Sequence, residues 1–211
     1  MKQACTMRAW TIATVLAVGA VPVPCQTVAS QAVAPQAVAS LTRIGQIVVA
    51  GRPVEFAVRH LPVNAFPALP GRVATELNRR GCTIPQTYEA HRPENVVRAS
   101  LERAGSEDWA VLCSSGGTVT LLVFFAGSGE PAVLATAQET ERLQAHDPSG
   151  VLGFNWGIDP ATPEQVYQAQ SGLRPRPARL DHEALADAVV EHRTVYHFHA
   201  QGAWTLVAMP D

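Results

Sequence analysis

Two histidines near the end of this 211-residue sequence have the spacing of a metal site. His197 and His199 are two residues apart in a run that predicts a β-strand, so both side chains leave one face, about 7 Å apart. Neutral imidazole is a preferred ligand of zinc and copper, and His182 is a candidate third ligand. The alternative is a set of half-buried histidines bonded to backbone or carboxylate groups. A transition-metal site, with zinc as an example, is therefore one hypothesis, and no other cofactor is expected.

Three arginines form a second set of candidate residues. Arg174, Arg176 and Arg179 lie in the segment Arg-Pro-Arg-Pro-Ala-Arg. Guanidinium groups bind carboxylate and phosphate through paired hydrogen bonds, so the segment could hold an anionic ligand. The interleaved prolines predict an extended arm, and the alternative is a solvated linker.

A serine nucleophile is the third chemistry to consider. Ser114 and Ser115 stand beside two glycines, but the sequence has no Gly-x-Ser-x-Gly motif, which would present a serine at a strained strand-to-helix turn. The serines and glycines together are typical of a hairpin turn. We therefore expect a turn here and no nucleophile.

The basic residues are almost all arginine, because Lys2 is the only lysine. If the N-terminal segment that contains Lys2 is removed, the mature chain has no lysine and cannot form a lysine Schiff base, hold a pyridoxal cofactor or present a Walker-type phosphate lysine. After Cys25 there are 14 arginines against 18 acidic residues, a balance of −4. Without a clustered basic face, nucleic-acid binding is not expected.

Cys82 and Cys113 are the two cysteines of the expected folded region. In an oxidising compartment we expect them to form a disulfide. The alternative, a reactive thiol, would need a histidine or a helix N-terminus beside it. The apolar surroundings of Cys113 favour the structural role.

The first 25 residues have a secretory pattern, with Lys2 and Arg8 before an apolar run at 9–21 and small residues after it. Cleavage after Ala20 or after Cys25 fits this pattern. Lipidation at Cys25 is the less favoured alternative, because Pro24 stands where a lipoprotein has a small residue. We expect a secreted or periplasmic protein, and no transmembrane span in the mature chain because the apolar run is too short.

The rest of the chain divides by composition. Residues 26–40 are three near-identical pentads of small residues, which predict a flexible tether. Residues 41–65 predict a marginal hairpin or a linker, with alternation of apolar and polar residues at 54–58. Residues 66–211 are expected to form a single globular domain.

The middle of the chain carries several element signals. Apolar spacing and Gly81 predict a helix at 70–80, and residues 94–103 fit either a strand or a helix. Apolar runs at 109–113 and 119–125 predict the central hairpin, followed by a short strand at 132–135.

The C-terminal third carries further element signals. Thr162, Pro163 and Gln165 fit a capping box that begins a helix ending near Gly172. Asp181 is expected to cap a short helix that carries Leu185 and Val189. A second hairpin is expected at 194–199 and 204–207, with His199 opposite Trp204 and His197 opposite Leu206.

Together these elements predict an α+β fold. We expect a mostly antiparallel sheet of about five strands, two or three helices packed on it, and one disulfide.

The order of several motifs resembles a group of uncharacterised secreted bacterial proteins. The motifs are Arg80-Gly-Cys-Thr-Ile-Pro-Gln86, Asp108-Trp-Ala-Val-Leu-Cys-Ser114, Asp181-His182, and Tyr196-His-Phe-His with Gly202 and Trp204. The resemblance implies a shared disulfide and a domain at about 66–211, and no activity attaches to the group. Residues 95–112 also resemble one propeller repeat of the FG-GAP type, without its calcium-ligand run. This second likeness favours a strand at 95–101.

We therefore expect a non-catalytic binding or interaction domain of the cell envelope, with an envelope or extracellular partner. The alternative is a metal-binding or metal-dependent hydrolytic protein that uses His197 and His199. A further alternative is an inhibitor-like module stabilised by the disulfide.

Overall fold

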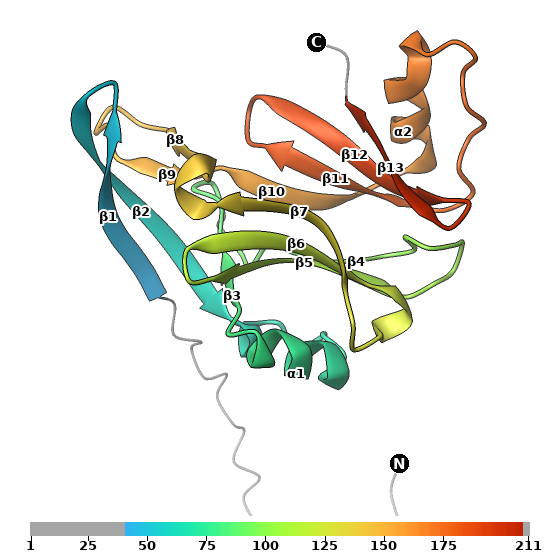
Figure 1. Ribbon diagram of the computed structural model, residues 1–211, viewed down its shortest axis with the longest axis horizontal. Coiled ribbons are helices and arrows are strands. Elements are labelled where there is room, and N and C mark those ends of the chain that lie inside the picture. Colours follow the sequence, from blue (N-terminus) through green and yellow to red (C-terminus); the bar gives the residue numbers. More distant parts are fainter. Residues whose placement is uncertain (1–40, 209–211) are drawn as a thin grey trace, which may run out of the picture. The chain divides into compact units, whose positions relative to one another are not determined.

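The hairpin expected at 109–125 forms two interior strands of the larger of two sheets (Figure 1). It is confirmed as β5 (Asp108–Ser115) and β6 (Thr118–Phe124), which pair antiparallel. Both strands are apolar at consecutive positions because both of their faces are covered. Ala110 and Leu112 contribute to one hydrophobic cluster, whereas Trp109 and Val111 contribute to another on the opposite face.

The computed structural model describes residues 41–208. The expected signal segment 1–25 and the expected tether 26–40 lie outside the described residues. Within 41–208 no helix is long and apolar enough to cross a membrane.

The larger sheet has the order β7-β6-β5-β3-β2-β9-β8, with β1 paired to β2 and β4 paired to β5. Its pairs are antiparallel except β2 with β9. Besides β5 and β6, its strands are β1 (Leu41–Val49), β2 (Arg52–Pro62), β3 (Thr83–Pro85), β4 (Val96–Ala99), β7 (Ala132–Gln138), β8 (Leu143–Ala145) and β9 (Leu152–Phe154).

The smaller sheet is an antiparallel array in chain order. Its strands are β10 (Trp156–Ala161), β11 (Ala184–Val189), β12 (Arg193–Ala200) and β13 (Ala203–Ala208). Trp156, Ile158 and Leu185 share a buried cluster with residues of the larger sheet, so the two sheets enclose a common core.

The observed fold is mostly β, with nine and four strands in the two sheets of the described region. The expected sheet of about five strands is therefore too small. Three of the unexpected strands, β3, β8 and β9, have only three residues each. A segment of that length carries no measurable periodicity, so only tertiary pairing identifies it as a strand.

Residues 41–65, expected as a marginal hairpin or a linker, contain a hairpin that belongs to the larger sheet. The hairpin is formed by β1 and β2, and β2 also pairs with β3 and β9. Ala50 and Gly51 make the two-residue turn, both with positive φ, as the right-handed twist of a hairpin requires.

The two expected helices with clear end signals are confirmed. The first is α1 (Gly71–Arg79), which buries Val73 and Leu77 on the cluster around the disulfide. The second is α2 (Pro163–Ala169), whose capping box is formed. In it, Gln165 N donates to Thr162 Oγ1 over 3.2 Å and Thr162 N donates to Gln165 Oε1 over 2.7 Å.

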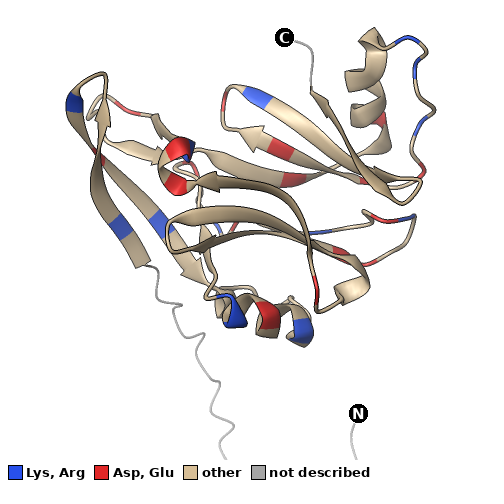
Figure 2. Ribbon diagram, viewed as in Figure 1, with Lys and Arg blue, Asp and Glu red and all other residues tan. Residues whose placement is uncertain are grey.

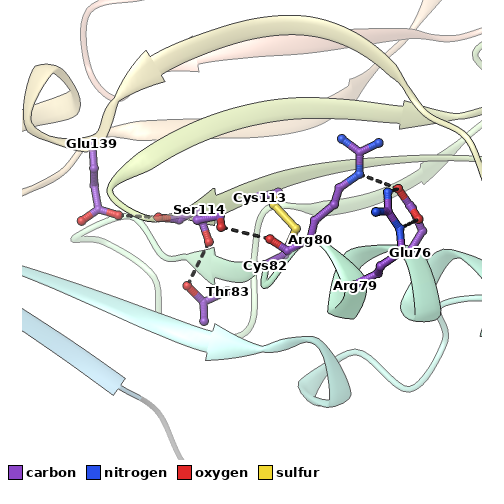
Figure 3. Close-up of a disulfide and its surroundings, with 9 residues drawn as sticks. Glu76, Arg79, Arg80, Cys82, Thr83, Cys113, Ser114 and Glu139 are labelled. Carbon is purple, nitrogen blue, oxygen red and sulfur yellow. Dashed lines mark hydrogen bonds and ion pairs between the residues drawn. A yellow bond between two sulfur atoms is a disulfide. The ribbon is translucent and has the colours of Figure 1, made fainter.

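The expected disulfide between Cys82 and Cys113 is also confirmed, with the two Cα atoms 5.0 Å apart (Figure 3). Cys82 follows α1 and Cys113 lies on β5. The bond therefore ties the helical layer to the centre of the larger sheet.

The prediction of a helix after Asp181 is wrong, because residues Ala184–Val189 form the strand β11. Leu185 and Val189 are four residues apart, a spacing that matches one helical face and also one strand face. Pairing with β10 on one side and β12 on the other decides for the strand. Asp181 therefore caps no helix.

Candidate functional site

The C-terminal hairpin places His197 and His199 as expected, opposite Leu206 and Trp204. His197 is buried, and its Nε2 lies 3.0 Å from Asp187 Oδ2. The other oxygen of Asp187 accepts a hydrogen bond from Trp156 Nε1 over 2.7 Å. His197 is thus one member of a hydrogen-bonded group that joins β10, β11 and β12 of the smaller sheet.

The remaining histidines have separate partners. His182 contacts Asp181 Oδ1 through Nδ1, at 2.7 Å, and the backbone oxygen of His199 through Nε2, at 2.8 Å. The ring of His199 packs against Phe125 and Trp204. Across the described part of the chain, no three histidine, cysteine, aspartate or glutamate side chains are placed to hold a metal ion. The fold does not bring His182, His197 and His199 together as ligands.

The arginine-rich arm folds back on α2. Arg176 and Arg179 both stack on the ring of Tyr167, at 3.4 and 4.5 Å from its centroid, and Arg179 pairs with Glu164 at 2.6 Å. Arg174 donates to the backbone oxygens of Ser171 and Leu173. These guanidinium groups contact α2 and the residues just after it instead of converging on a common site.

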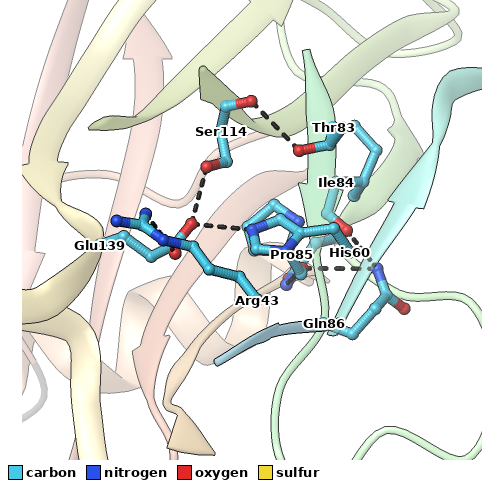
Figure 4. Close-up of polar contacts among 9 residues, drawn as sticks. Arg43, His60, Thr83, Ile84, Pro85, Gln86, Ser114 and Glu139 are labelled. Atoms are coloured by element: carbon cyan, nitrogen blue, oxygen red, sulfur yellow. Dashed lines mark hydrogen bonds and ion pairs between the residues drawn. The ribbon is translucent and has the colours of Figure 1, made fainter. Parts of the chain in front are cut away.

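A different polar cluster, which we call the Glu139 cluster, gathers side chains from distant segments (Figure 4). Glu139 begins the single 3₁₀ turn Glu139–Arg142 after β7, and its side chain is only 1% exposed. One carboxylate oxygen, Oε2, accepts from Ser114 Oγ over 2.7 Å and lies 2.8 Å from His60 Nε2. The other oxygen accepts from Arg43 Nη1 over 3.0 Å. The cluster thereby joins β1, β2 and β5 to the turn after β7.

The electrostatics of the Glu139 cluster favour an ionised carboxylate. Burial alone would raise the pKa of Glu139, but hydrogen bonds from His60 and Ser114 and the charge of Arg43 lower it below its ordinary value. A general base that activates serine at neutral pH needs a pKa near 7. Because Ser114 donates directly to this acidic carboxylate, and His60 contacts Glu139 rather than Ser114, the arrangement does not fit a catalytic triad.

A hollow of about 460 Å³ lies beside the cluster, and the start of β1 forms part of its wall. Leu41, Thr42 and Arg43 line it from β1, opposite Gly116 and Gly117 of the β5–β6 turn. A Cβ at Gly117 would lie 3.1 Å from Arg43 Nη1. The glycine thus leaves room for the guanidinium to reach Glu139.

Strand β1 carries most of the exposed large hydrophobic residues of the described region. Seven large hydrophobic residues are exposed within the described region, and four of them, Leu41, Ile44, Val48 and Val49, lie on this one strand. Ile44 and Val48 are each 74% exposed. Arg43 is the single charged residue of β1, and Figure 2 shows how few charges this strand carries.

One edge of β1 pairs with β2, and among residues 41–208 no strand pairs with the other edge. Hydrogen-bond parity shows which groups face that edge. Backbone groups of successive residues in a strand point to opposite edges. Arg59 O accepts from Gln86 N on the β3 side, so the backbone groups of His60 point to β1, where His60 pairs with Leu41. Along β1, the backbone groups of Leu41 and of every second residue after it therefore point to β2. Backbone N–H and C=O groups of Thr42, Ile44, Gln46 and Val48 therefore face away from β2.

Sequence reasoning did not identify the Glu139 cluster or the β1 edge as a site. His60 follows the alternating run 54–58, which was a signal that its side chain shares a face with buried Val58. Glu139 stands in a polar stretch, Gln-Glu-Thr-Glu-Arg, in which nothing distinguishes a buried carboxylate from exposed ones. The sequence presents Ser114 only as a possible nucleophile or turn residue, and not as a hydrogen-bond donor to a buried carboxylate.

Comparisons with protein-family models, with curated proteins and with solved structures found no match. Function is therefore inferred from the geometry of the residues themselves.

Proposed function

We propose that this protein is an exported binding domain without catalytic activity, which holds an extended segment of a partner by adding it as a strand to β1. The observation that carries the proposal is the open apolar edge of β1, with Ile44 and Val48 each 74% exposed. Export is supported by the secretory pattern of residues 1–25 and by the Cys82–Cys113 disulfide, which is typical of oxidising compartments.

Strand addition to this edge would use two kinds of contact. The outward backbone groups of β1 would form a ladder with the partner, which supplies affinity without requiring a particular sequence. Covering the exposed apolar side chains adds about 1.5–3 kcal/mol for each one fully buried, before the cost of ordering the partner. The partner that fits is an extended envelope or extracellular segment with apolar residues at alternate positions and few charges.

The Glu139 cluster supports this function by holding β1 in place. Few side chains of β1 are buried, so apolar packing alone fixes it weakly. Arg43 anchors the strand to buried Glu139, and Gly45 lies flat against the ring of Phe56, where a Cβ would come within 2.6 Å. An edge that is already extended and fixed reduces the entropy lost when a partner binds.

The lack of a competent nucleophile among the clustered residues supports a non-catalytic role. Ser114 is 4% exposed and donates its hydroxyl hydrogen bond to Glu139, whose pKa is lowered. Both carboxylate oxygens are engaged, one by Arg43 and the other by His60 and Ser114. Such an arrangement stabilises the fold and leaves no free base for acid–base chemistry.

The test is to select extended peptides from a displayed random library on the purified chain and to map the binding site by amide hydrogen exchange. We expect a bound peptide to slow exchange at the outward amides Thr42, Ile44, Gln46 and Val48. The variant Gln46→Pro removes one outward N–H and leaves the β1–β2 hydrogen bonds intact, because proline is tolerated where an edge N–H faces solvent. It should weaken peptide binding at least about fivefold.

The matched control is Gln46→Thr, which keeps the backbone N–H and should bind as the parent chain does. Unchanged far-ultraviolet dichroism shows that both variants are folded. Selected peptides that protect other strands while the β1 amides exchange at their free rate, or equal binding by Gln46→Pro, would contradict the proposal.

A further inference from the structure

We propose that a second copy of this chain occupies the open edge of β1, so that two larger sheets join across a two-fold axis at Gly45. This inference rests on the proposed function, because it names a partner for the same edge. It is carried by the self-complementarity of the sequence Leu-Thr-Arg-Ile-Gly-Gln-Ile-Val-Val along that strand.

The backbone of β1 fits such a pairing. In an antiparallel pair centred on Gly45, Thr42 faces Val48 of the other copy and Ile44 faces Gln46. All four residues direct their backbone groups outward, as established by the register with β2. Each facing pair can therefore exchange both of its hydrogen bonds, as the antiparallel ladder requires.

The side chains fit the same register. Leu41 of one copy lies opposite Val49 of the other, and both are exposed in the single chain. Ile44 and Val48 meet across diagonal positions on the outer face, within reach of each other. One pairing thus places a side chain of the other copy beside each of the four exposed hydrophobic residues of the strand. Moving the axis to Ile44 or Gln46 would leave an end of each strand unpaired.

The charges also permit this contact. Arg43 lies opposite Ile47 of the other copy, so no like charges face each other. Its guanidinium is already paired with Glu139 of its own chain. Free edges of natural sheets are commonly protected by lysine, proline or a bulge, and β1 has none of these. An edge that lacks such protection is suited to pairing with its own copy.

The register can be tested with single cysteines, in a background where Cys5 and Cys25 are replaced by serine. Thr42→Cys and Val48→Cys face each other only between copies, whereas Thr42 lies far from its own equivalent across the axis. Under mild oxidation, we expect an equimolar mixture of the two variants to form a cross-linked dimer, and each variant alone to remain uncross-linked. Equal cross-linking in all three samples, or none in the mixture, would overturn the proposed register.

Sedimentation equilibrium of the purified chain tests the association itself. We expect a monomer–dimer equilibrium whose dissociation constant rises about 30-fold in Gln46→Pro, which loses one backbone hydrogen bond on each side of the axis. Gln46→Thr should dimerise as the parent does. A chain that is monomeric at every concentration overturns the inference.

Peptide binding separates the two proposals. A monomeric chain whose β1 amides are still protected by a selected extended peptide retains the proposed function and loses only the second copy as its partner. A monomeric chain that binds no peptide along β1 contradicts both.

Discussion

Glu139 shows how one side chain determines the position of a strand far away in sequence. Its carboxylate is buried, which by itself opposes ionisation. Hydrogen bonds from His60 and Ser114, and the charge of Arg43, outweigh that effect and lower its pKa. The ionised form is thus the one that the folded chain stabilises, and it links the β1–β2 hairpin to the sheet centre.

Replacing Glu139 with glutamine should destabilise the fold in a pH-dependent manner. At pH 7 we expect the free energy of unfolding to fall by about 2–3 kcal/mol, because charged hydrogen bonds are lost in a buried site. The folded pKa is lower than the unfolded pKa of about 4.5, so the contribution is full above that value. It is lost as the pH falls through the folded pKa.

Urea unfolding between pH 3 and pH 7 measures this effect. The difference between the parent and Glu139→Gln should shrink as the solution is acidified. Ser114→Ala removes one hydrogen bond and leaves the carboxylate, so it should cost only about 1 kcal/mol at pH 7. A difference between parent and Glu139→Gln that stays constant over this pH range would show that the charge of Glu139 does not stabilise the fold.

At the scale of elements, the connection between the two sheets depends on Asn95, just before β4. Its side chain donates to the backbone oxygens of Pro85 and Trp156, at 2.7 and 3.1 Å, and accepts from Ile158 N over 3.1 Å. The residue is buried, and its φ of +67° lies in the left-handed region. Asparagine is among the few residues that combine this backbone shape with local hydrogen bonds.

Substitution of Asn95 should separate the contribution of its side-chain hydrogen bonds from that of its left-handed backbone conformation. Asn95→Gly loses the side-chain hydrogen bonds and also removes the Cβ from the left-handed region, whereas Asn95→Ala loses the same hydrogen bonds and keeps a Cβ there. We expect both variants to lose about 2–3 kcal/mol of stability. The alanine variant should lose about 1 kcal/mol more than the glycine variant. Denaturant midpoints compare them, and an alanine variant as stable as the glycine variant would exclude the backbone contribution.

At the scale of the whole molecule, the disulfide ties the layer of α1 to the larger sheet. Cys82 and Cys113 are 31 residues apart, and both belong to the cluster that contains Val73 and Leu77 of α1. The bond therefore restricts the conformations of the unfolded chain over a segment that forms several elements of the fold. Its loss affects the layer that covers one face of β5 and β6.

Reduction of the disulfide should lower the free energy of unfolding by about 3–4 kcal/mol, the loop-closure entropy for this separation. Guanidinium unfolding with and without dithiothreitol measures the loss. The variant with Cys82→Ala and Cys113→Ala keeps the apolar character of the cluster. Its stability should equal that of the reduced parent and should not respond to the reductant. A reductant effect that persists in this variant would assign the loss to another cause.

Local signals in the sequence were sufficient to predict the elements whose ends are marked by capping or turn residues. The helix at α1 was predicted from the spacing of Val73 and Leu77 and from Gly81 after it, and α2 from the capping box at Thr162. The central hairpin was predicted because turn residues separate two apolar runs. These signals act within a few residues, so they are independent of the rest of the fold.

Two other points depended on contacts between distant residues. The helix predicted after Asp181 is wrong, and the pattern of residues 41–65 predicted a hairpin or a linker without deciding whether it joins the sheet. Leu185 and Val189 fit a helix and a strand equally well, and neighbouring strands decided between them. The hairpin at 41–62 gains its place in the sheet from pairing with β3 and β9 and from Arg43 on Glu139. Contacts of this kind join residues up to 96 positions apart.

By itself, the sequence determined the disulfide pair, the two helices, both hairpins predicted at the centre and at the C-terminus, and the alignment of His197 and His199 with their strand neighbours. Each of these follows from the period of a strand or helix, from turn chemistry, or from the number of available cysteines. Only the tertiary structure decided that the histidines have separate partners, that Glu139 is buried among Arg43, His60 and Ser114, and that β1 has an open apolar edge. Burial and edge exposure depend on which segments meet, and local sequence patterns do not carry that information.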